Sequence, residues 1–95
     1  MNIYLTATLN SKPEFTEEVK AVLQTMVTES RKEKACIQYD LHQGIKDKTL
    51  FVFWEIWESE AALQEHNQQP YIQAFGKLVD EKLQETPKIY FTEKI

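Results

Sequence analysis

His66 combines a reactive side chain with a position where that side chain should be buried. It continues the apolar side of a short helical pattern that contains Ala62 and Leu63, so its ring is expected to point toward a sheet. An imidazole has an ordinary pKa of about 6.5, and a neutral one in a dry cavity can accept a proton near working pH. The same position also suits a histidine that only bonds a carboxylate or closes its helix.

Glu55 is the single charged residue inside the apolar run 50–57. Burying a carboxylate costs free energy unless it is paired, so Glu55 should have a dedicated hydrogen-bond partner. Tyr39, His66 and Arg31 are the candidate partners. A bond to His66 would orient a base, whereas a carboxylate in this place could equally be a structural link between sheet and helix.

Arg31 is the only arginine among the eleven basic residues. A guanidinium can bind an anion through two parallel hydrogen bonds, and a cation near a helix end also complements the helix dipole. Both roles are open for Arg31. A further set of side chains could line a pocket for a planar molecule or simply form core: Tyr39, Phe53, Trp57, Phe75 and Met26.

The elements that must position these side chains follow from the hydrophobic periodicity. Alternation of apolar and polar residues predicts four strands: 3–9, 36–42, 50–57 and a last stretch that contains Ile89, Phe91 and Ile95. In the second strand Ile37, Tyr39 and Leu41 should share one face, with Cys36 on the other. The polar turn at 44–48 predicts that strands two and three form an antiparallel hairpin.

Helical spacing predicts the segments between the strands. Ser11 and Glu14 form a capping box before a long helix over roughly 13–33. Ser59 is the expected N-cap of a short helix that ends near His66.

A further helix should begin at Pro70, carry Phe75 and Leu83 on its apolar side, and end at Pro87. The resulting order β-α-β-β-α-β, with the second helix broken, is that of an α+β ferredoxin-like sandwich. A chain of 95 residues is expected to form one domain over 1–95.

The third strand is apolar on both faces. Phe53 should lie on one face, and Val52, Trp54 and Ile56 on the other. A chain this short can usually cover only one face of a sheet with its own helices. The second face is therefore expected to pack on another subunit, giving a homodimer through sheet faces.

The composition argues against several kinds of function. A formal charge of −4 and a pI near 5.1 leave no basic footprint for nucleic acid or an anionic membrane. An RNA-binding sheet of the same strand order is also disfavoured, because 50–57 has no Lys, Arg or Gly. No apolar stretch approaches the ~18 residues of a membrane span.

Metal, nucleotide and disulfide chemistry are not expected either. Two histidines and one cysteine without ligand spacing predict no metal site, and no Gly-rich loop predicts a nucleotide cofactor. Cys36 cannot form an internal disulfide. The N-terminus reads as a strand rather than a signal peptide, so the reducing cytoplasm is the expected compartment.

Three segments together carry a family resemblance: Arg31–Tyr39, Phe53–Trp57 and Ser59–His66, followed by Pro70 and Phe75. They resemble the antibiotic biosynthesis monooxygenase domain, most of all its small quinol-monooxygenase-like branch, over nearly the whole chain. The resemblance implies a ferredoxin-like homodimer with sheets packed face to face, a dimeric α/β-barrel. It also implies cofactor-independent oxygenation of phenols or hydroquinones by dioxygen.

A haem-degrading branch of the same family uses an Asn in the first strand, a Trp in the third and a His on the later helix. Trp57 matches that pattern, but Thr6 falls near the Asn position and Gly76 or Phe75 near the His. Haem degradation is therefore disfavoured.

The leading hypothesis is a monooxygenase that acts on a phenolic or quinol-type aromatic without metal or flavin. His66 would be the base, Tyr39 or Arg31 would stabilise the anion, Glu55 would orient the base, and Trp57 would stack on the substrate. The alternative is a non-catalytic dimeric α/β-barrel protein that binds a small apolar ligand. Oxygen uptake with a panel of quinols separates the two.

Overall fold

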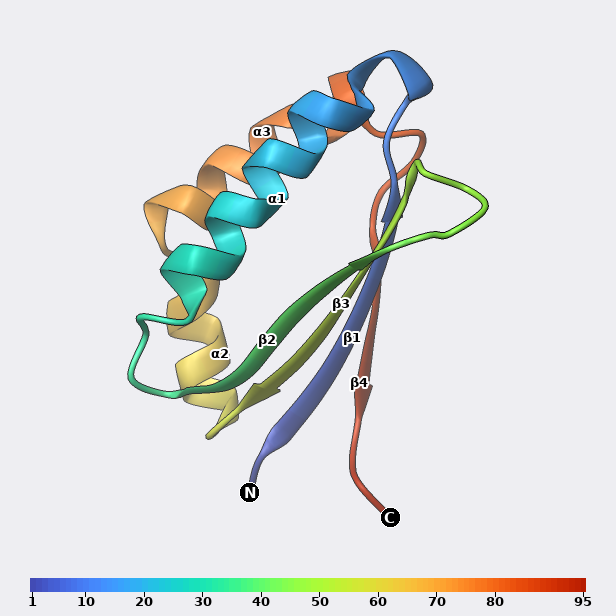
Figure 1. Ribbon diagram of the computed structural model, residues 1–95. Helices are drawn as coiled ribbons and strands as arrows, with labels where there is room; N and C mark the ends of the chain where they lie inside the picture. Colours follow the sequence, from blue (N-terminus) through green and yellow to red (C-terminus); the bar gives the residue numbers. More distant parts are fainter.

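The computed structural model describes the chain from Met1 to Ile95, and it folds into one sheet with all of its helices on the same face (Figure 1). The elements in chain order are β1 (Ile3–Asn10), a 3₁₀ turn (Pro13–Phe15), α1 (Thr16–Ser30), β2 (Cys36–Gln43), β3 (Leu50–Trp57), α2 (Glu60–Asn67), α3 (Pro70–Lys82) and β4 (Lys88–Thr92). The strand order is β2-β3-β1-β4, and every neighbouring pair is antiparallel. The predicted α+β ferredoxin-like fold is confirmed.

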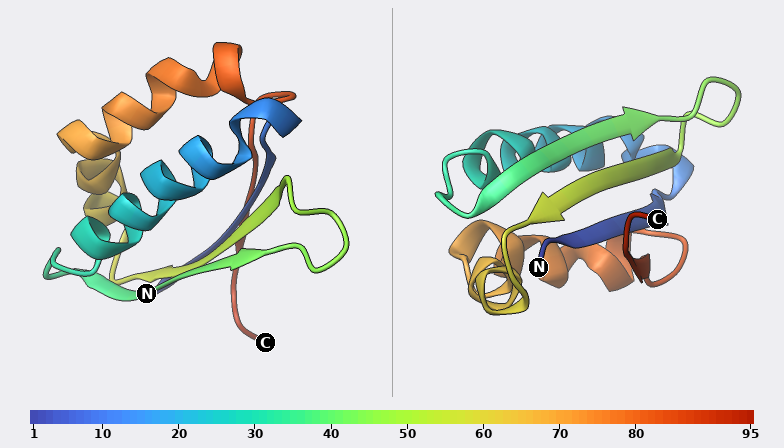
Figure 2. Two further views of the ribbon diagram at one scale, coloured as in Figure 1. Left: turned by 45° about the horizontal axis from the view of Figure 1, so that its top comes forward. Right: turned by 90° about the horizontal axis from the view of Figure 1, so that it is seen from below.

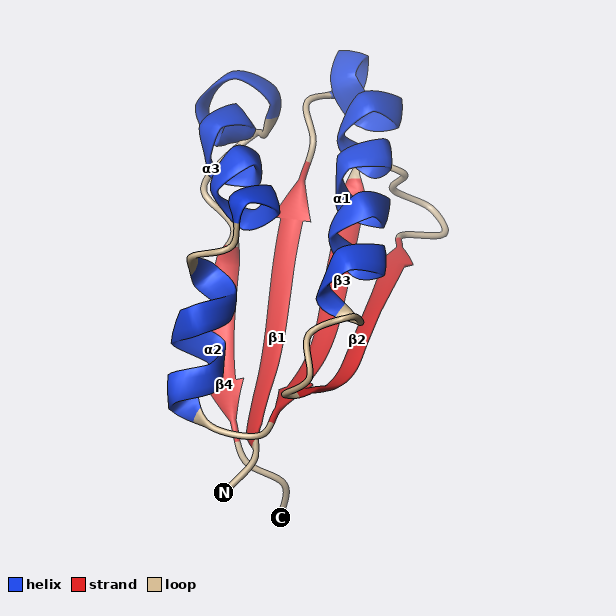
Figure 3. Cartoon of the chain, turned by 90° about the vertical axis from the view of Figure 1, so that its left-hand side faces the viewer, coloured by secondary structure: helices blue, strands red, loops and turns tan.

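The helices form a second layer above the sheet. α1 and α3 lie side by side (Figure 2), with α1 over the β2–β3 half of the sheet and α2 and α3 over the β1–β4 half (Figure 3). No helix is long and apolar enough to cross a membrane. The opposite face of the sheet carries no helix.

β3 is a central strand, and its two faces differ as the alternation predicts. Phe51, Phe53 and Trp57 are buried beneath the helices. Trp54 points the other way and remains 48% exposed. The core between sheet and helices is made of twelve buried residues: Leu5, Ala7, Leu9, Val19, Leu23, Met26, Tyr39, Phe51, Phe53, Trp57, Leu63 and Leu83.

The face predicted for the start of β2 is wrong. Cys36 pairs with Trp57 and Gln38 with Ile56, so Ile37 is an extra residue between two ladder positions. Such a bulge inverts the alternation on its N-terminal side. Cys36 therefore packs against the core, and Ile37 is 50% exposed.

The first helix is shorter than predicted. A separate 3₁₀ turn precedes α1, which ends at Ser30 rather than near residue 33. The capping box is also wrong, because the Ser11 hydroxyl pairs with the hydroxyl of Thr16 at 2.8 Å and caps no backbone N–H.

The other two helices begin where the sequence predicts. The Ser59 hydroxyl accepts a hydrogen bond from the backbone N–H of Ala62 at 3.1 Å, which confirms the N-cap of α2, and Pro70 opens α3. α3 ends earlier than expected, at Lys82. Leu83 is extended and buried, and it forms a β-bridge with Ser11.

Candidate functional site

A cavity of about 380 Å³ lies between the sheet and the helices. Ten of its sixteen lining residues are hydrophobic, so it suits an apolar ligand. Six of the eight predicted site residues line it: His66, Tyr39, Glu55, Phe53, Phe75 and Met26. The volume is near the lower end of the ~300–1,000 Å³ that is usual for small-molecule pockets.

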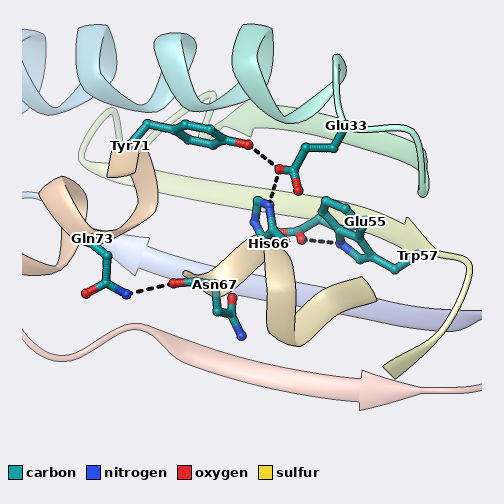
Figure 4. Close-up of polar contacts among 7 residues, drawn as sticks. All are labelled: Glu33, Glu55, Trp57, His66, Asn67, Tyr71 and Gln73. Atoms are coloured by element: carbon teal, nitrogen blue, oxygen red, sulfur yellow. Dashed lines mark hydrogen bonds and ion pairs between the residues drawn. The ribbon is translucent and has the colours of Figure 1, made fainter. Parts of the chain in front are cut away.

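His66 is the residue around which the site is organised (Figure 4). Because α2 starts directly after β3, its last turn places the imidazole over that strand. The ring centroid is 4.3 Å from that of Trp57 and 5.7 Å from that of Tyr39. The residue is only 3% exposed, and burial lowers the pKa of the imidazole below its ordinary value. The three aromatic side chains thus lie together, but only His66 and Tyr39 line the cavity.

One carboxylate joins His66 to a third helix. The Glu33 Oε2 atom lies 2.6 Å from His66 Nδ1, and the same oxygen accepts a hydrogen bond from the Tyr71 hydroxyl (Figure 4). Glu33 belongs to the turn before β2, and Tyr71 to the first turn of α3. Burial, together with the bond to Glu33, raises the pKa of Tyr71, so its hydroxyl remains a donor.

Glu55 has a different partner from those predicted. Its Oε1 atom accepts a 2.8 Å hydrogen bond from the indole Nε1–H of Trp57, two residues along the same face of β3. Tyr39 is directly opposite Glu55 in the ladder but does not bond it. Burial raises the pKa of the Glu55 carboxyl to about 7, although the Trp57 bond opposes the shift.

Tyr39 also lines the cavity. Its ring lies 5.3 Å from that of Phe53. Burial and the nearby Glu55 carboxylate raise the pKa of Tyr39. The phenol therefore stays protonated and can donate a hydrogen bond.

Two predicted site residues lie outside the cavity lining. Arg31 donates from Nε to the Tyr39 carbonyl and from a terminal nitrogen to Asp40, each at 3.0 Å, and its side chain is 57% exposed. These bonds to β2 hold it on the surface, apart from His66. Trp57 is fully buried beneath His66, so it stacks on that ring rather than facing the cavity.

Sequence reasoning missed Glu33 and Tyr71 as partners of His66. Glu33 is the only acidic residue in the basic stretch 31–34, and Tyr71 directly follows the helix-starting Pro70. Those positions are unusual but do not by themselves indicate a contact with a histidine. A second contact between helices also escaped prediction: Gln73 Nε2 donates to the backbone carbonyl of Asn67 at 2.7 Å, at the edge of the cavity (Figure 4).

The arrangement supports proton transfer better than metal or thiol chemistry. No three His, Cys, Asp or Glu side chains are grouped so that they could hold a metal ion. Burial raises the pKa of the Cys36 thiol to about 11, so no thiolate is available near neutral pH. His66 and Glu55, by contrast, are titratable groups on the wall of an apolar cavity.

Known proteins resemble this chain over most of its length. It is 38% identical over 73 residues to "Putative monooxygenase YcnE" of Bacillus subtilis, which is 77% of each chain. It is 36% identical over 73 residues to the uncharacterized protein sll1783 of Synechocystis, covering 77% of this chain but spanning only 50% of that protein. The crystal structure of PA3566 from Pseudomonas aeruginosa superimposes with a TM-score of 0.93 at 33% identity, covering 99% of this chain and 94% of that one.

The sequence model of the antibiotic biosynthesis monooxygenase family matches residues 2–78, which include β1, β2, β3, α1, α2 and most of α3. The matched segment carries all of the cavity wall except Pro87 and Ile89, together with the histidine and the carboxylate that bonds it. This chain belongs to the antibiotic biosynthesis monooxygenase family.

Proposed function

We propose that this protein is a monooxygenase that oxidises a phenolic or quinol-type aromatic with dioxygen, without metal or flavin. The observation that carries the proposal is the state of His66. Its Nδ1 atom is hydrogen-bonded to Glu33, the side-chain hydrogen bonds of the chain do not involve Nε2, and the residue lines an apolar cavity. A neutral imidazole in such a place can accept the hydroxyl proton of a bound phenol.

The reaction would begin with transfer of the phenol proton to His66. The phenolate is electron-rich and can pass one electron to dioxygen, after which the two radicals combine at a ring carbon. Loss of water then leaves a quinone, so one oxygen atom enters the product and the other leaves as water. The substrate supplies all four electrons, and the step needs no external reductant.

Tyr39 is the better of the two candidate anion stabilisers. Tyr39 lines the cavity and keeps its phenol proton, whereas Arg31 is bonded to β2 on the surface. A hydrogen-bond donor beside a developing oxyanion lowers the barrier most when water is excluded. Phe53, Phe75 and Met26 would provide the apolar contacts to the ring.

The test is oxygen uptake with a panel of phenols and quinols, followed by mass spectrometry of the product formed under ¹⁸O₂. We expect one labelled oxygen in the product. Substrate oxidation that yields hydrogen peroxide and an unlabelled product would show an oxidase instead. Saturable binding of the panel without oxygen uptake would favour the non-catalytic ligand-binding protein, which the mainly apolar cavity also suits.

A matched pair of histidine variants tests the role of the base. His66→Ala should lower turnover by about 10²-fold or more, the usual contribution of a general base. His42→Ala is the control, because that histidine is exposed on β2 and outside the cavity. Equal turnover in both variants would remove His66 from the chemistry.

We also propose that the protein is a homodimer formed through the open face of the sheet and that it works in the cytoplasm. Trp54 and Tyr90 lie about half exposed on that face, where no helix covers them. An exposed apolar face of this kind commonly marks a protein interface.

The free thiol of Cys36 supports the proposed location in the cytoplasm, because the cytoplasm is a reducing compartment.

A further inference from the structure

The contact between Glu33 and His66 fixes more than the position of the ring. At 2.6 Å the pair makes a short hydrogen bond, and the carboxylate oxygen has no proton to give while it is ionised. The proton in the bond must then belong to Nδ1. In a neutral imidazole the other nitrogen, Nε2, is left with its lone pair free.

Tyr71 changes how strongly the carboxylate attracts that proton. Its hydroxyl donates to the same Oε2 atom that faces His66, so both donors share one acceptor. A hydroxyl that bonds a carboxylate draws off part of its negative charge. Tyr71 should therefore weaken the pull of Glu33 on the imidazole, and at the same time tie α3 to the turn before β2.

We propose that Glu33 is a positioning residue that holds neutral His66 as its Nδ1–H tautomer with Nε2 free to accept a proton, and that Tyr71 moderates its basicity. The inference rests on the proposed function for its meaning in catalysis. The proton on Nδ1 and the affinity of the ring for a second proton are nevertheless properties of the free protein. They can be measured without any substrate.

The ionisable groups around His66 come from the turn before β2 and from four helices and strands. Glu33 lies in the turn before β2, Tyr71 in α3, Tyr39 in β2 and Glu55 in β3. α1 contributes Glu29, which acts electrostatically on Tyr71. Glu55 has a pKa of about 7 and lines the same cavity, so its titration must be separated from that of His66.

The experiment is a ¹⁵N NMR titration of the histidine side chains in the wild-type protein and in a Glu55→Gln background. In both, neutral His66 should carry its proton on Nδ1. Glu33→Gln should lower the pKa of His66, because burial disfavours the imidazolium and the carboxylate that opposes burial is gone. Tyr71→Phe should raise the pKa of His66, because the Glu33 carboxylate then no longer shares its negative charge with the Tyr71 hydroxyl.

The opposite signs distinguish positioning from a merely structural role. Both substitutions remove a hydrogen bond and should lower the melting temperature. A merely structural role therefore predicts that both shift the His66 pKa in the same direction. Glu65→Gln is the control, since that carboxylate is exposed on α2 next to His66 in sequence and makes no bond to it. If Glu33→Gln does not fold, Glu33→Asp is the second variant. It keeps the negative charge on a shorter side chain, so it should lower the pKa of His66 by less than Glu33→Gln would.

Three results would overturn the proposal. They are a wild-type His66 that is neutral as the Nε2–H tautomer, a His66 pKa that Glu33→Gln leaves unchanged, and shifts of the same sign in Glu33→Gln and Tyr71→Phe. On an active enzyme Glu33→Gln should lower kcat about ten-fold or more and move the acid limb of the pH profile to lower pH. If no substrate is oxidised but the titrations behave as expected, the positioning role stands and the monooxygenase proposal fails.

Discussion

The two tryptophans of this chain lie three residues apart on β3 and have opposite surroundings. Trp57 faces the helices, is fully buried, stacks on His66 and donates to Glu55. Trp54 faces away from the helices and is 48% exposed. The strand period of two places one residue beside the candidate site and the other on an open surface.

The difference shows how a short chain can hold buried polar groups. On the helix side each buried carboxylate contact is made by a specific donor: Trp57 bonds Glu55, and Tyr71 bonds Glu33. Burying these groups without such partners would cost free energy. On the face of the sheet without helices, apolar side chains such as Trp54 need no such hydrogen bonds. The proposed partner subunit would bury them.

The largest effect should follow from removing the inner tryptophan. Trp57→Ala opens a cavity beneath His66 and leaves Glu55 without its donor, so it should lower the free energy of unfolding by about 3–5 kcal/mol. Urea denaturation at neutral pH measures this. Trp57→Phe is the informative companion, because it keeps most of the volume but removes the N–H. A loss below about 1 kcal/mol for Trp57→Ala would contradict the packing described here.

The matching change on the outer face should act on assembly rather than on the fold. Trp54→Lys places a charge where the proposed dimer would bury an aromatic side chain, and loss of such an anchor costs about 2 kcal/mol or more of binding free energy. We expect dissociation in small-angle scattering with little change in the unfolding of the protomer. Gln64→Lys adds the same charge on exposed α2 and should leave the oligomer intact. A wild-type protein that is already monomeric at micromolar concentration would refute the dimer.

The pH dependence of stability should reveal the buried carboxyl on the inner face. Because burial raises the folded-state pKa of Glu55 to about 7, its protonated form is favoured by folding. That contribution is complete below the unfolded pKa of about 4.3 and is lost as the pH rises through about 7. Between about pH 6 and about pH 8 the wild type should lose about 1 kcal/mol that Glu55→Gln retains, as measured by urea denaturation at each pH. Parallel profiles for the two proteins would contradict the raised pKa.

Much of the fold could be predicted because it depends on the spacing of apolar residues, which can be read directly from the sequence. The faces of β3 follow from alternation, and Ser59 and Pro70 mark helix starts by their own chemistry. The face of Ile37 was predicted wrongly because no residue type marks the bulge. A bulge adds one residue without changing the composition of the strand.

The polar contacts of the site were harder to predict than the residues themselves. His66, Tyr39 and Glu55 could be selected by type and position, but Glu33 is 33 residues from His66 and 38 from Tyr71 in sequence. Fifteen acidic residues were available as partners, and only the packing of turn, α2 and α3 selects one of them.

The smallest effect should come from a substitution of Cys36, which lies next to the bulge in β2 and on the helix-covered face of the sheet. The thiol packs against the core only partly and has a pKa raised to about 11, so we expect a protonated packing group without a role in proton transfer. Cys36→Ala removes one partly buried sulfur atom and should cost about 1 kcal/mol or less of stability, with turnover per folded molecule unchanged. Denaturation and oxygen uptake on the same preparation measure both. A folded Cys36→Ala protein without activity would mean that the chemistry of the inner face extends to the thiol, and that the site centred on His66 is incomplete.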